Sequence, residues 1–400
     1  MAAACNITEE QSAAHSWPPE VELLLSCARA HVDAEGAARV RALVGQEFDW
    51  DYLLRVSNRH GLQPLLYHHL NAICPAAIPD TYAQQLRDAA RRVSALNTFL
   101  TNELQRLLAR FAVAEIEAMP YKGPVLAVEL YGNVALRQFS DLDILVRPRD
   151  VARASELLQA EGYALLPPLN RVQQALLMRV QCNLPFTREQ NRLVVELHWA
   201  VSAPSFARPF TTDTLWAGRE SGRLGATEFK RLAVEDLLLA LCVHGSKHLW
   251  ERLAWVSDIA ELLRQRREVN WSKLIATARA TGSERMLLLG LRLAADLLAA
   301  PLPAEAAQAL AADPVVGTLA AEVARYLFTP ALTPSGLAGY FRFQLKSRRR
   351  LRDKVQYLRF VITPTEKDLA RLNLPTPLTF VYYLLRPVRM LTTGGPEHFQ

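Results

Sequence analysis

Residues 137–146 read RQFSDLDILV, two aspartates one residue apart followed by a run of aliphatic side chains. The aliphatics at 144–146 predict a buried strand, which we expect to begin at Asp141. Side chains two residues apart in a strand point to the same face, so Asp141 and Asp143 should project together. Two ionised carboxylates at this spacing repel one another, and a divalent cation between them outweighs the repulsion. The stretch therefore predicts a metal site at the edge of a rigid strand.

A second strand with acidic character is expected at NRLVVELHW, residues 191–199. Glu196 and His198 share one face of it, while Val195 and Leu197 share the other. If this strand lies beside the first, Glu196 supplies a third carboxylate. Three carboxylates on adjacent strands can hold two metal ions about 3.5–4 Å apart, the spacing that stabilises an attacking and a leaving oxygen together.

A phosphate-binding turn is indicated by KGP at residues 122–124. Gly123 lets the backbone approach a phosphate, and a helix beginning at Pro124 presents free N–H groups to an anion. Lys122 adds a positive charge, and the planar fork of Arg137 can clamp a phosphate with two parallel hydrogen bonds. Each signal alone also occurs in turns and loops that bind nothing. Their order along the chain is what indicates a site.

The flanking regions have the period of helices. From about residue 20 to 112, apolar residues recur at spacings of three and four residues. Asp49 is placed to cap a helix in this region, and Gly61 is placed to end one. Short strands mix with helices up to about 200, where Asp150 is expected to cap a helix, and the helical period returns beyond Leu232. This pattern predicts a small α/β unit with a mixed sheet between two helical regions.

Composition describes a globular protein, since 50% of the residues are hydrophobic and 22% are charged. The net charge of +6 is concentrated in KSRRRLRDK at 346–354, which we interpret first as a solvated helix face. Five widely spaced cysteines without a CxxC pair suggest neither a disulfide framework nor a zinc site. No signal peptide or membrane-spanning segment is recognisable, which predicts a cytoplasmic protein without membrane insertion.

The succession of strand, Lys-Gly turn, helix, Arg-x-x-Ser-Asp-x-Asp and a later Glu resembles the nucleotidyltransferase superfamily, whose core is similar to that of DNA polymerase beta. Within it, the sequence looks closest to the uncharacterised bacterial nucleotidyltransferase family proteins. The resemblance implies an α+β fold, a small mixed-sheet nucleotidyltransferase core flanked by N-terminal and C-terminal helical regions. We expect four segments: an N-terminal helical region 1–112, the core 113–230, a helical domain 231–335 that completes the nucleotide site, and a basic, Pro-punctuated helical segment 336–400.

The same resemblance implies roles for particular residues. Asp141, Asp143 and Glu196 would bind Mg²⁺ or Mn²⁺ and carry catalysis. The nucleotide and its phosphates would be bound by Lys122, Gly123, Arg137 and Ser140. Two features depart from the family pattern, because the turn is Lys-Gly rather than Gly-Ser and the interval from Gly123 to Asp141 is longer than usual.

The helical stretch HGSKHLWERLAWVSD at 244–258 offers a second half of the site. His244, Lys247 and His248 fall at helical spacings of three and four, so one face can present them all to a nucleotide. The alternative is that both histidines are packing residues and that Asp258 pairs with Arg252 or caps locally.

The predicted reaction is metal-dependent transfer of an NMP group from an NTP, with ATP as the expected donor, to an acceptor hydroxyl, with release of pyrophosphate. The acceptor is left open among a small molecule, a glycan, a peptide and RNA, and so is the oligomeric state. One alternative is a catalytically silent nucleotide-binding or partner-binding protein on the same scaffold. Another is a toxin-like enzyme directed at RNA or tRNA, with the run 346–354 contacting phosphates.

Overall fold

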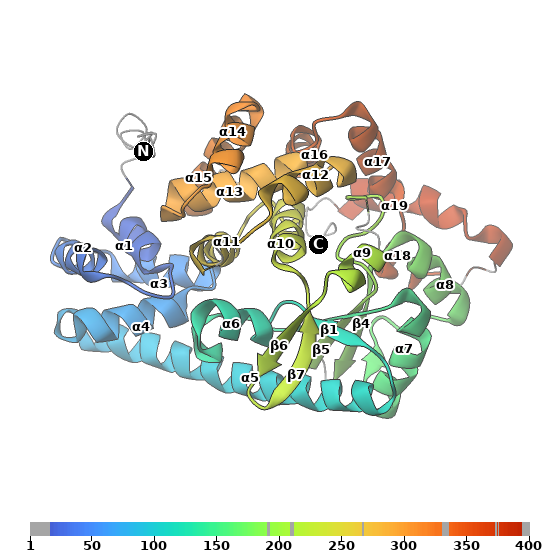
Figure 1. Cartoon of the computed structure of the whole chain (residues 1–400), viewed down its shortest axis with the longest axis horizontal. Coiled ribbons are helices and arrows are strands. Elements are labelled where there is room, and N and C mark those ends of the chain that lie inside the picture. The colour runs from blue at the N-terminus through green and yellow to red at the C-terminus, as the bar shows by residue number, and fades with distance from the viewer. Residues whose placement is uncertain are drawn as a thin grey trace.

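The computed structural model describes residues 17–189, 193–208, 212–265, 268–329, 336–372, 374 and 376–393. Helices dominate both ends of the described chain, and the strands lie between them in sequence (Figure 1). The expected α+β class, a small mixed sheet flanked by helical regions, is confirmed.

The N-terminal part is helical as predicted. Asp49 accepts a hydrogen bond from the backbone N–H of Tyr52 at 2.8 Å, which caps the third helix. Gly61 has φ +69°, the left-handed conformation that ends this helix. The elements are α1 (Pro19–Cys27), α2 (Ala34–Val44), α3 (Trp50–Arg59), α4 (Gln63–Ile73), η1 (Pro75–Ala77) and α5 (Asp80–Val113).

A five-stranded sheet follows, with spatial order β1-β2-β5-β4-β3. Its strands are β1 (Ala118–Pro120), β2 (Leu142–Val146), β3 (Ala164–Leu165), β4 (Asn183–Arg188) and β5 (Leu193–His198). The two central strands β2 and β5 are parallel, and the other neighbours are antiparallel. The sheet is therefore mixed, as the sequence predicts.

The two faces of this sheet differ because side chains alternate along each strand. Leu142 and Ile144 of β2, with Val195 and Leu197 of β5, point to the face covered by α5 and by α7 (Val151–Ala160). Asp143, the residue between the two β2 aliphatics, projects to the opposite face. The long helix α5 runs below the sheet in Figure 1, and the helical half of the chain lies above it.

Elements between the strands are only partly as predicted. Helix α6 (Pro124–Tyr131) begins at Pro124, and η2 (Val134–Leu136) follows it. Asp150 occupies the N-terminal position of α7, but its side chain makes no capping hydrogen bond and pairs with Arg153 at 3.2 Å, so the predicted cap is wrong. Elements in this part of the chain without a counterpart in the sequence prediction include η2, η3 (Pro148–Asp150), α8 (Arg171–Val180), α9 (Thr212–Ala217) and the two strands of a hairpin, β6 (Glu220–Leu224) and β7 (Thr227–Arg231).

The C-terminal half is helical. Its elements are α10 (Val234–Lys247), α11 (Leu253–Gln265), α12 (Trp271–Thr281), α13 (Glu284–Leu298), α14 (Ala304–Ala311), α15 (Pro314–Phe328), α16 (Gly336–Lys346), α17 (Leu351–Ile362), α18 (Glu366–Leu369), η5 (Thr376–Leu378) and α19 (Val381–Thr393). Within the described ranges, no helix combines the length and the apolar character that crossing a bilayer requires.

Buried apolar side chains form two clusters. One joins α1–α4 to the helices after Leu232, and includes Leu24, Leu66, Leu238 and Val256. The other joins the sheet to the second half of α5, to α7 and to Leu369 of α18. The first cluster thus spans segments far apart in sequence, and the division into four segments stays a prediction.

The basic run 346–354 is not simply a solvated face. Arg348 is buried, and its guanidinium donates to the carbonyl oxygens of Gln344 at 2.6 Å and Phe206 at 2.8 Å. It also lies over the ring of Tyr357, 4.1 Å from the centroid. Burial lowers the pKa of Arg348 to about 10. The expectation of a fully solvated run is therefore wrong at Arg348, which the fold uses to join α16 to the loop before α9.

Candidate active site

The Lys-Gly turn between β1 and α6 packs against the loop that leads into β2. Gly123 has φ +56°, a conformation that side chains disfavour. A Cβ at this position would lie 3.2 Å from the carbonyl oxygen of Asp141, so the backbone of the turn closely approaches that of the acidic stretch. The turn predicted to bind phosphate and the residues predicted to bind metal are thus neighbours in space.

Strand pairing brings the acidic residues of β2 and β5 together. The parallel register sets Asp143 opposite Glu196 and Leu145 opposite His198. Because these positions alternate with the apolar ones, Asp143, Glu196 and His198 share the face turned away from α5. One oxygen or nitrogen from each of the three lies within 4.8 Å of the others. We call these three residues the sheet cluster.

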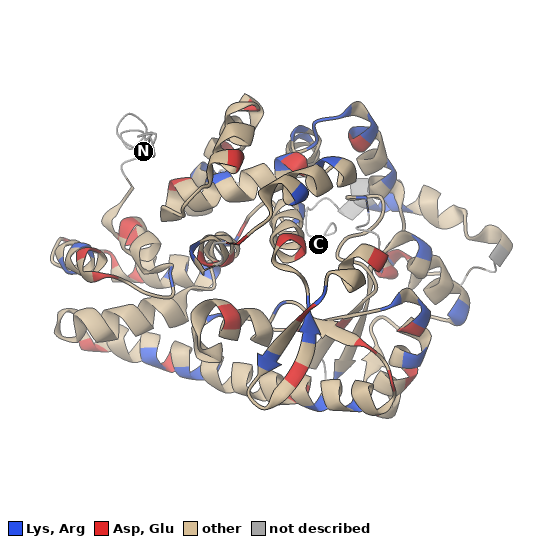
Figure 2. Cartoon of the chain, viewed as in Figure 1, with Lys and Arg blue, Asp and Glu red and all other residues tan. Residues whose placement is uncertain are grey.

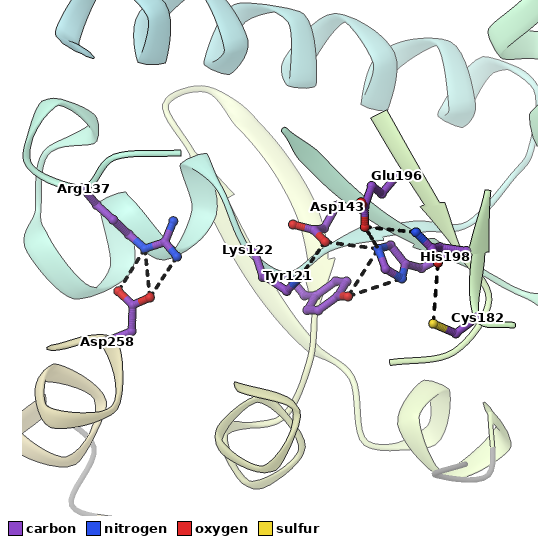
Figure 3. A network of polar contacts seen from close by, with 9 residues as sticks. Tyr121, Lys122, Arg137, Asp143, Cys182, Glu196, His198 and Asp258 are labelled. Atoms are coloured by element: carbon purple, nitrogen blue, oxygen red, sulfur yellow. Dashed lines mark hydrogen bonds and ion pairs between the residues drawn. The ribbon is translucent and has the colours of Figure 1, made fainter. Parts of the chain in front are cut away.

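Hydrogen bonds tie the sheet cluster to Lys122 (Figure 3). The Lys122 ammonium donates to Asp143 Oδ1 at 2.7 Å, and the same oxygen lies 3.1 Å from His198 Nε2. His198 Nε2 is also 3.1 Å from Glu196 Oε2. Burial alone would raise the pKa of Asp143, but the Lys122 cation and His198 outweigh it and hold that pKa well below its usual value. Asp143 is therefore a carboxylate, and Lys122 supplies the positive charge beside it.

Asp141 lies just outside this cluster. Strand β2 begins at Leu142 rather than at Asp141, so the expectation that both aspartates belong to the strand is wrong by one residue. Burial, followed by the negative charges of Asp143 and Glu196, raises the pKa of Asp141 to about 6. Each negative charge disfavours the ionised form of the neighbouring carboxyl group. A divalent cation bound between them would offset this repulsion.

Three further residues support the cluster. The Tyr121 hydroxyl lies 3.4 Å from His198 Nδ1, and the two rings meet edge to face at 5.4 Å. Asn183 donates to Glu196 Oε2 at 3.1 Å, and Cys182 Sγ lies 3.7 Å from the side-chain oxygen of Asn183. Sequence reasoning noticed His198 beside Glu196 but assigned it no role. It missed Tyr121, Cys182 and Asn183, whose proximity depends on sheet pairing.

Arg137 is not directed at the Lys-Gly turn. Its guanidinium holds the carboxylate of Asp258 on α11 with two nitrogens, at 2.9 Å and 2.8 Å, and the Tyr131 hydroxyl donates to the same carboxylate at 3.0 Å. The Asp258 partner is thus Arg137, and the alternative pairing with Arg252 is wrong. Ser140 is exposed at the start of the acidic stretch. Its phosphate-binding role and that of Arg137 stay predictions.

The end of α10 faces this region from the helical half. The rings of His244 and His248 lie 4.6 Å apart, and the Trp255 ring lies 5.1 Å and 5.5 Å from them. Burial, then the charge of Lys122, lowers the pKa of His244 well below its usual value. For His248, burial and then Lys247 act in the same direction. Both histidines are neutral near pH 7, and they pack on Trp255 while lying within electrostatic reach of the turn.

The donor set of the sheet cluster fits a divalent cation. Two carboxylates and one imidazole, with atoms inside 4.8 Å, are ligands that Mn²⁺ and related metals accept, while carboxylates alone suit Mg²⁺. The charges of the site fit a cation as well. Asp143 carries a negative charge that the Lys122 ammonium partly balances, and a metal ion could balance it in the same place.

Fold and site together place the protein in the class of α+β nucleotidyltransferases, with carboxylates on a mixed sheet beside a glycine turn and a helix N-terminus. A family model described as "Uncharacterised nucleotidyltransferase" matches residues 46–299, and the chain belongs to this family. The match spans the chain from before α3 to the end of α13, and so includes the sheet cluster, the turn and α10. No curated protein matches the chain, and no solved structure does.

Proposed function

We propose that this protein transfers an NMP group from an NTP to an acceptor hydroxyl in a metal-dependent reaction. The observation that carries the proposal is the sheet cluster beside the Gly123 turn at the N-terminus of α6. In the reaction the acceptor oxygen forms a bond to the α-phosphorus, and the bond from that phosphorus to the bridging oxygen breaks. Pyrophosphate leaves, and the acceptor proton passes to a protein base.

Asp143, Glu196 and His198 would hold the cation, with Asp141 beside them as a further carboxylate. A bound Mg²⁺ or Mn²⁺ supplies positive charge that favours the ionised acceptor oxygen and stabilises the charge on the phosphates. Of the two carboxylates in the cluster, Glu196 is the one that an acceptor can reach, because its side chain is 31% exposed and that of Asp143 is 3% exposed. We therefore assign proton acceptance to Glu196.

Lys122 and the N-terminus of α6 would bind the triphosphate. With a cation balancing the charge of Asp143, the Lys122 ammonium would be able to turn to a phosphate oxygen of the nucleotide. The first N–H groups of α6 and the left-handed Gly123 offer the anion-binding geometry of a helix start. Lys247, with His244 and His248, would close the nucleotide site from α10, with ATP as the expected donor.

One observation favours the silent alternative. The Lys122–Asp143 pair neutralises the site internally, as in a nucleotide-binding protein that needs no metal. The RNA-directed alternative is weakened at Arg348, which is buried and bonded to backbone carbonyls.

The test is incubation of the purified protein with each α-labelled NTP, Mg²⁺ or Mn²⁺ and fractions of a cell lysate. We expect label to appear on one acceptor, found by mass spectrometry, with pyrophosphate released in equal amount and no transfer in the presence of a chelator. Binding of NTP without pyrophosphate release over all fractions would support the silent alternative instead.

A further inference from the structure

Helix α17 exposes a narrow apolar stripe. Leu351, Val355, Leu358 and Ile362 are exposed by 77%, 45%, 50% and 42%. They are spaced by four, three and four residues, so at about 100° per residue they form one line along the helix. The opposite side of the same helix is buried through Tyr357 and Phe360. The helix is therefore fixed to the fold by one face and presents aliphatic side chains on the other.

Basic residues border this stripe on both sides. Lys354 lies along one edge, and Arg352 and Arg359 lie along the other. Arg352 has a carboxylate at 3.6 Å, in Asp353. Among the residues that the structure describes, Lys354 and Arg359 have no ion-pair partner. An apolar centre with cationic edges is the pattern of a helix that lies in the plane of a membrane interface.

The surroundings of α17 extend the positive charge. Residues 336–400 carry 12 Lys and Arg against 4 Asp and Glu, a net +8, whereas the whole chain has a net charge of +6. Lys and Arg gather where α16 passes into α17 (Figure 2). A hollow of about 670 Å³ beside the stripe is lined by Arg285, Arg342, Lys346, Arg349 and Lys354. Arg285, Lys346 and Arg349 are paired with Asp313, Glu322 and Glu284, which leaves Arg342 and Lys354 as the cations of the hollow without an ion-pair partner among the described residues.

We propose that α17 lies flat on an anionic lipid surface, with its aliphatic stripe among the acyl chains and the bordering cations at the headgroup phosphates. The neighbouring helix α19 packs against α17 and also exposes aliphatic side chains, Leu384 by 64% and Val388 by 58%. This binding is peripheral and independent of the reaction proposed above.

The stripe distinguishes a lipid surface from the other occupants. Nucleic acid would use the cations, but four exposed aliphatics offer it neither base stacking nor hydrogen bonds. A second copy of the chain, docked about a two-fold axis, would bring Lys354 and Arg359 of one copy against the same cations of the other. An anionic bilayer satisfies both the apolar centre and the charged edges.

The test is flotation of the full-length protein with vesicles of phosphatidylcholine alone or phosphatidylcholine with phosphatidylglycerol. We expect binding to the anionic vesicles only, weakened by salt. The double variant Leu351→Gln, Leu358→Gln should lower the partition constant at least about tenfold, since two aliphatic side chains lose their burial. The double variant Lys354→Ala, Arg359→Ala should lower the partition constant about 25-fold, at about fivefold per cation.

Matched controls come from α5, which lies outside the proposed surface. Val113 is 80% exposed, and Val113→Gln should bind as the wild type does; so should Arg92→Ala, at an exposed arginine. Circular dichroism of each variant checks that the helices are retained. The proposal is overturned if the protein does not float with anionic vesicles, or if the α17 variants float as the controls do. A dimer would overturn it as well. In that case light scattering shows a dimer, the two leucine replacements dissociate it, and the protein does not bind vesicles.

Discussion

Lys122 and Arg137 were both expected to bind phosphate, and each pairs with an aspartate instead, but the two pairs differ in what surrounds the carboxylate. Lys122 pairs with Asp143 through one oxygen, in contact with His198 and close to Glu196. Arg137 pairs with Asp258 through two nitrogens, and Tyr131 takes up a further bond to the same carboxylate. Lys122 therefore holds a carboxylate that a metal could take over, whereas Arg137 holds one whose bonds are already complete. A basic residue near a site is a candidate for phosphate binding only when another cation, such as a metal ion, can take its place beside the carboxylate.

The largest expected effect is at Asp143. Replacing Asp143 by Asn removes a charged donor from the sheet cluster, and we expect kcat/KM for NTP turnover to fall at least about 1000-fold, the equivalent of several kcal/mol of lost charge stabilisation. Steady-state pyrophosphate release measures it. The matched control is Asp150→Asn, another buried acid in an ion pair with arginine, which should retain the wild-type rate. Full activity of Asp143→Asn would rule out the assignment.

Arg137→Met should act on stability instead. It leaves the Asp258 carboxylate buried without its cation, and we expect the free energy of unfolding to fall by about 3–5 kcal/mol, with an unchanged KM for NTP in the folded protein. Urea unfolding and steady-state kinetics measure the two quantities. Arg39→Met serves as control, because the exposed Arg39–Glu22 pair should contribute less than about 1 kcal/mol. A stable variant with a raised KM would return Arg137 to the phosphate site.

The pH dependence of stability isolates Asp141. Its pKa is raised to about 6 in the folded protein, so the folded state keeps a proton that the unfolded chain has released. Stability of the metal-free protein should therefore fall as the pH rises from about 4 to about 6. Asp141→Asn removes this loss. We expect its free energy of unfolding to exceed that of the wild type by on the order of 2 kcal/mol at pH 7, and the difference to disappear below about pH 4. Urea unfolding in chelator measures it, and a pH-independent difference would contradict the explanation.

The smallest effect is expected at Lys122, and it has two directions. In Lys122→Met the metal no longer competes with the ammonium for Asp143, so Mn²⁺ should bind about tenfold more tightly. The NTP should bind about tenfold more weakly, because a phosphate contact is lost. Calorimetric titrations of metal and of NTP measure the two constants. If both constants weaken together, Lys122 does not exchange its partner as proposed.

Local features of this fold were predictable because they depend on neighbouring residues. The aliphatics after Asp143 predicted β2, and Gly123 followed by Pro124 predicted the turn and the start of α6. The hairpin of residues 220–231 was missed because charged residues fill its strands, so the sequence there has no apolar alternation. Periodicity finds a strand only where one face is apolar.

The site was predictable only as far as strand geometry reaches. Period-two alternation placed Asp143 and Glu196 each on one face of its own strand, and the condition that the two strands be neighbours is met by the register, which sets the two residues opposite one another. Ion-pair partners are different, because Lys122 finds Asp143 across 21 residues and Arg137 finds Asp258 across 121. No local pattern encodes such pairs, so the sequence could nominate the basic residues without indicating which of them the fold had already used.

Direct measurement of metal binding tests the central claim most closely. Electron paramagnetic resonance of Mn²⁺ can be titrated against the wild type, Asp143→Asn, Glu196→Gln and the Asp150→Asn control. The sheet cluster as the metal site predicts that Asp143→Asn and Glu196→Gln each weaken binding at least about 100-fold, while Asp150→Asn binds as the wild type does. Wild-type affinity in Asp143→Asn would contradict the claim.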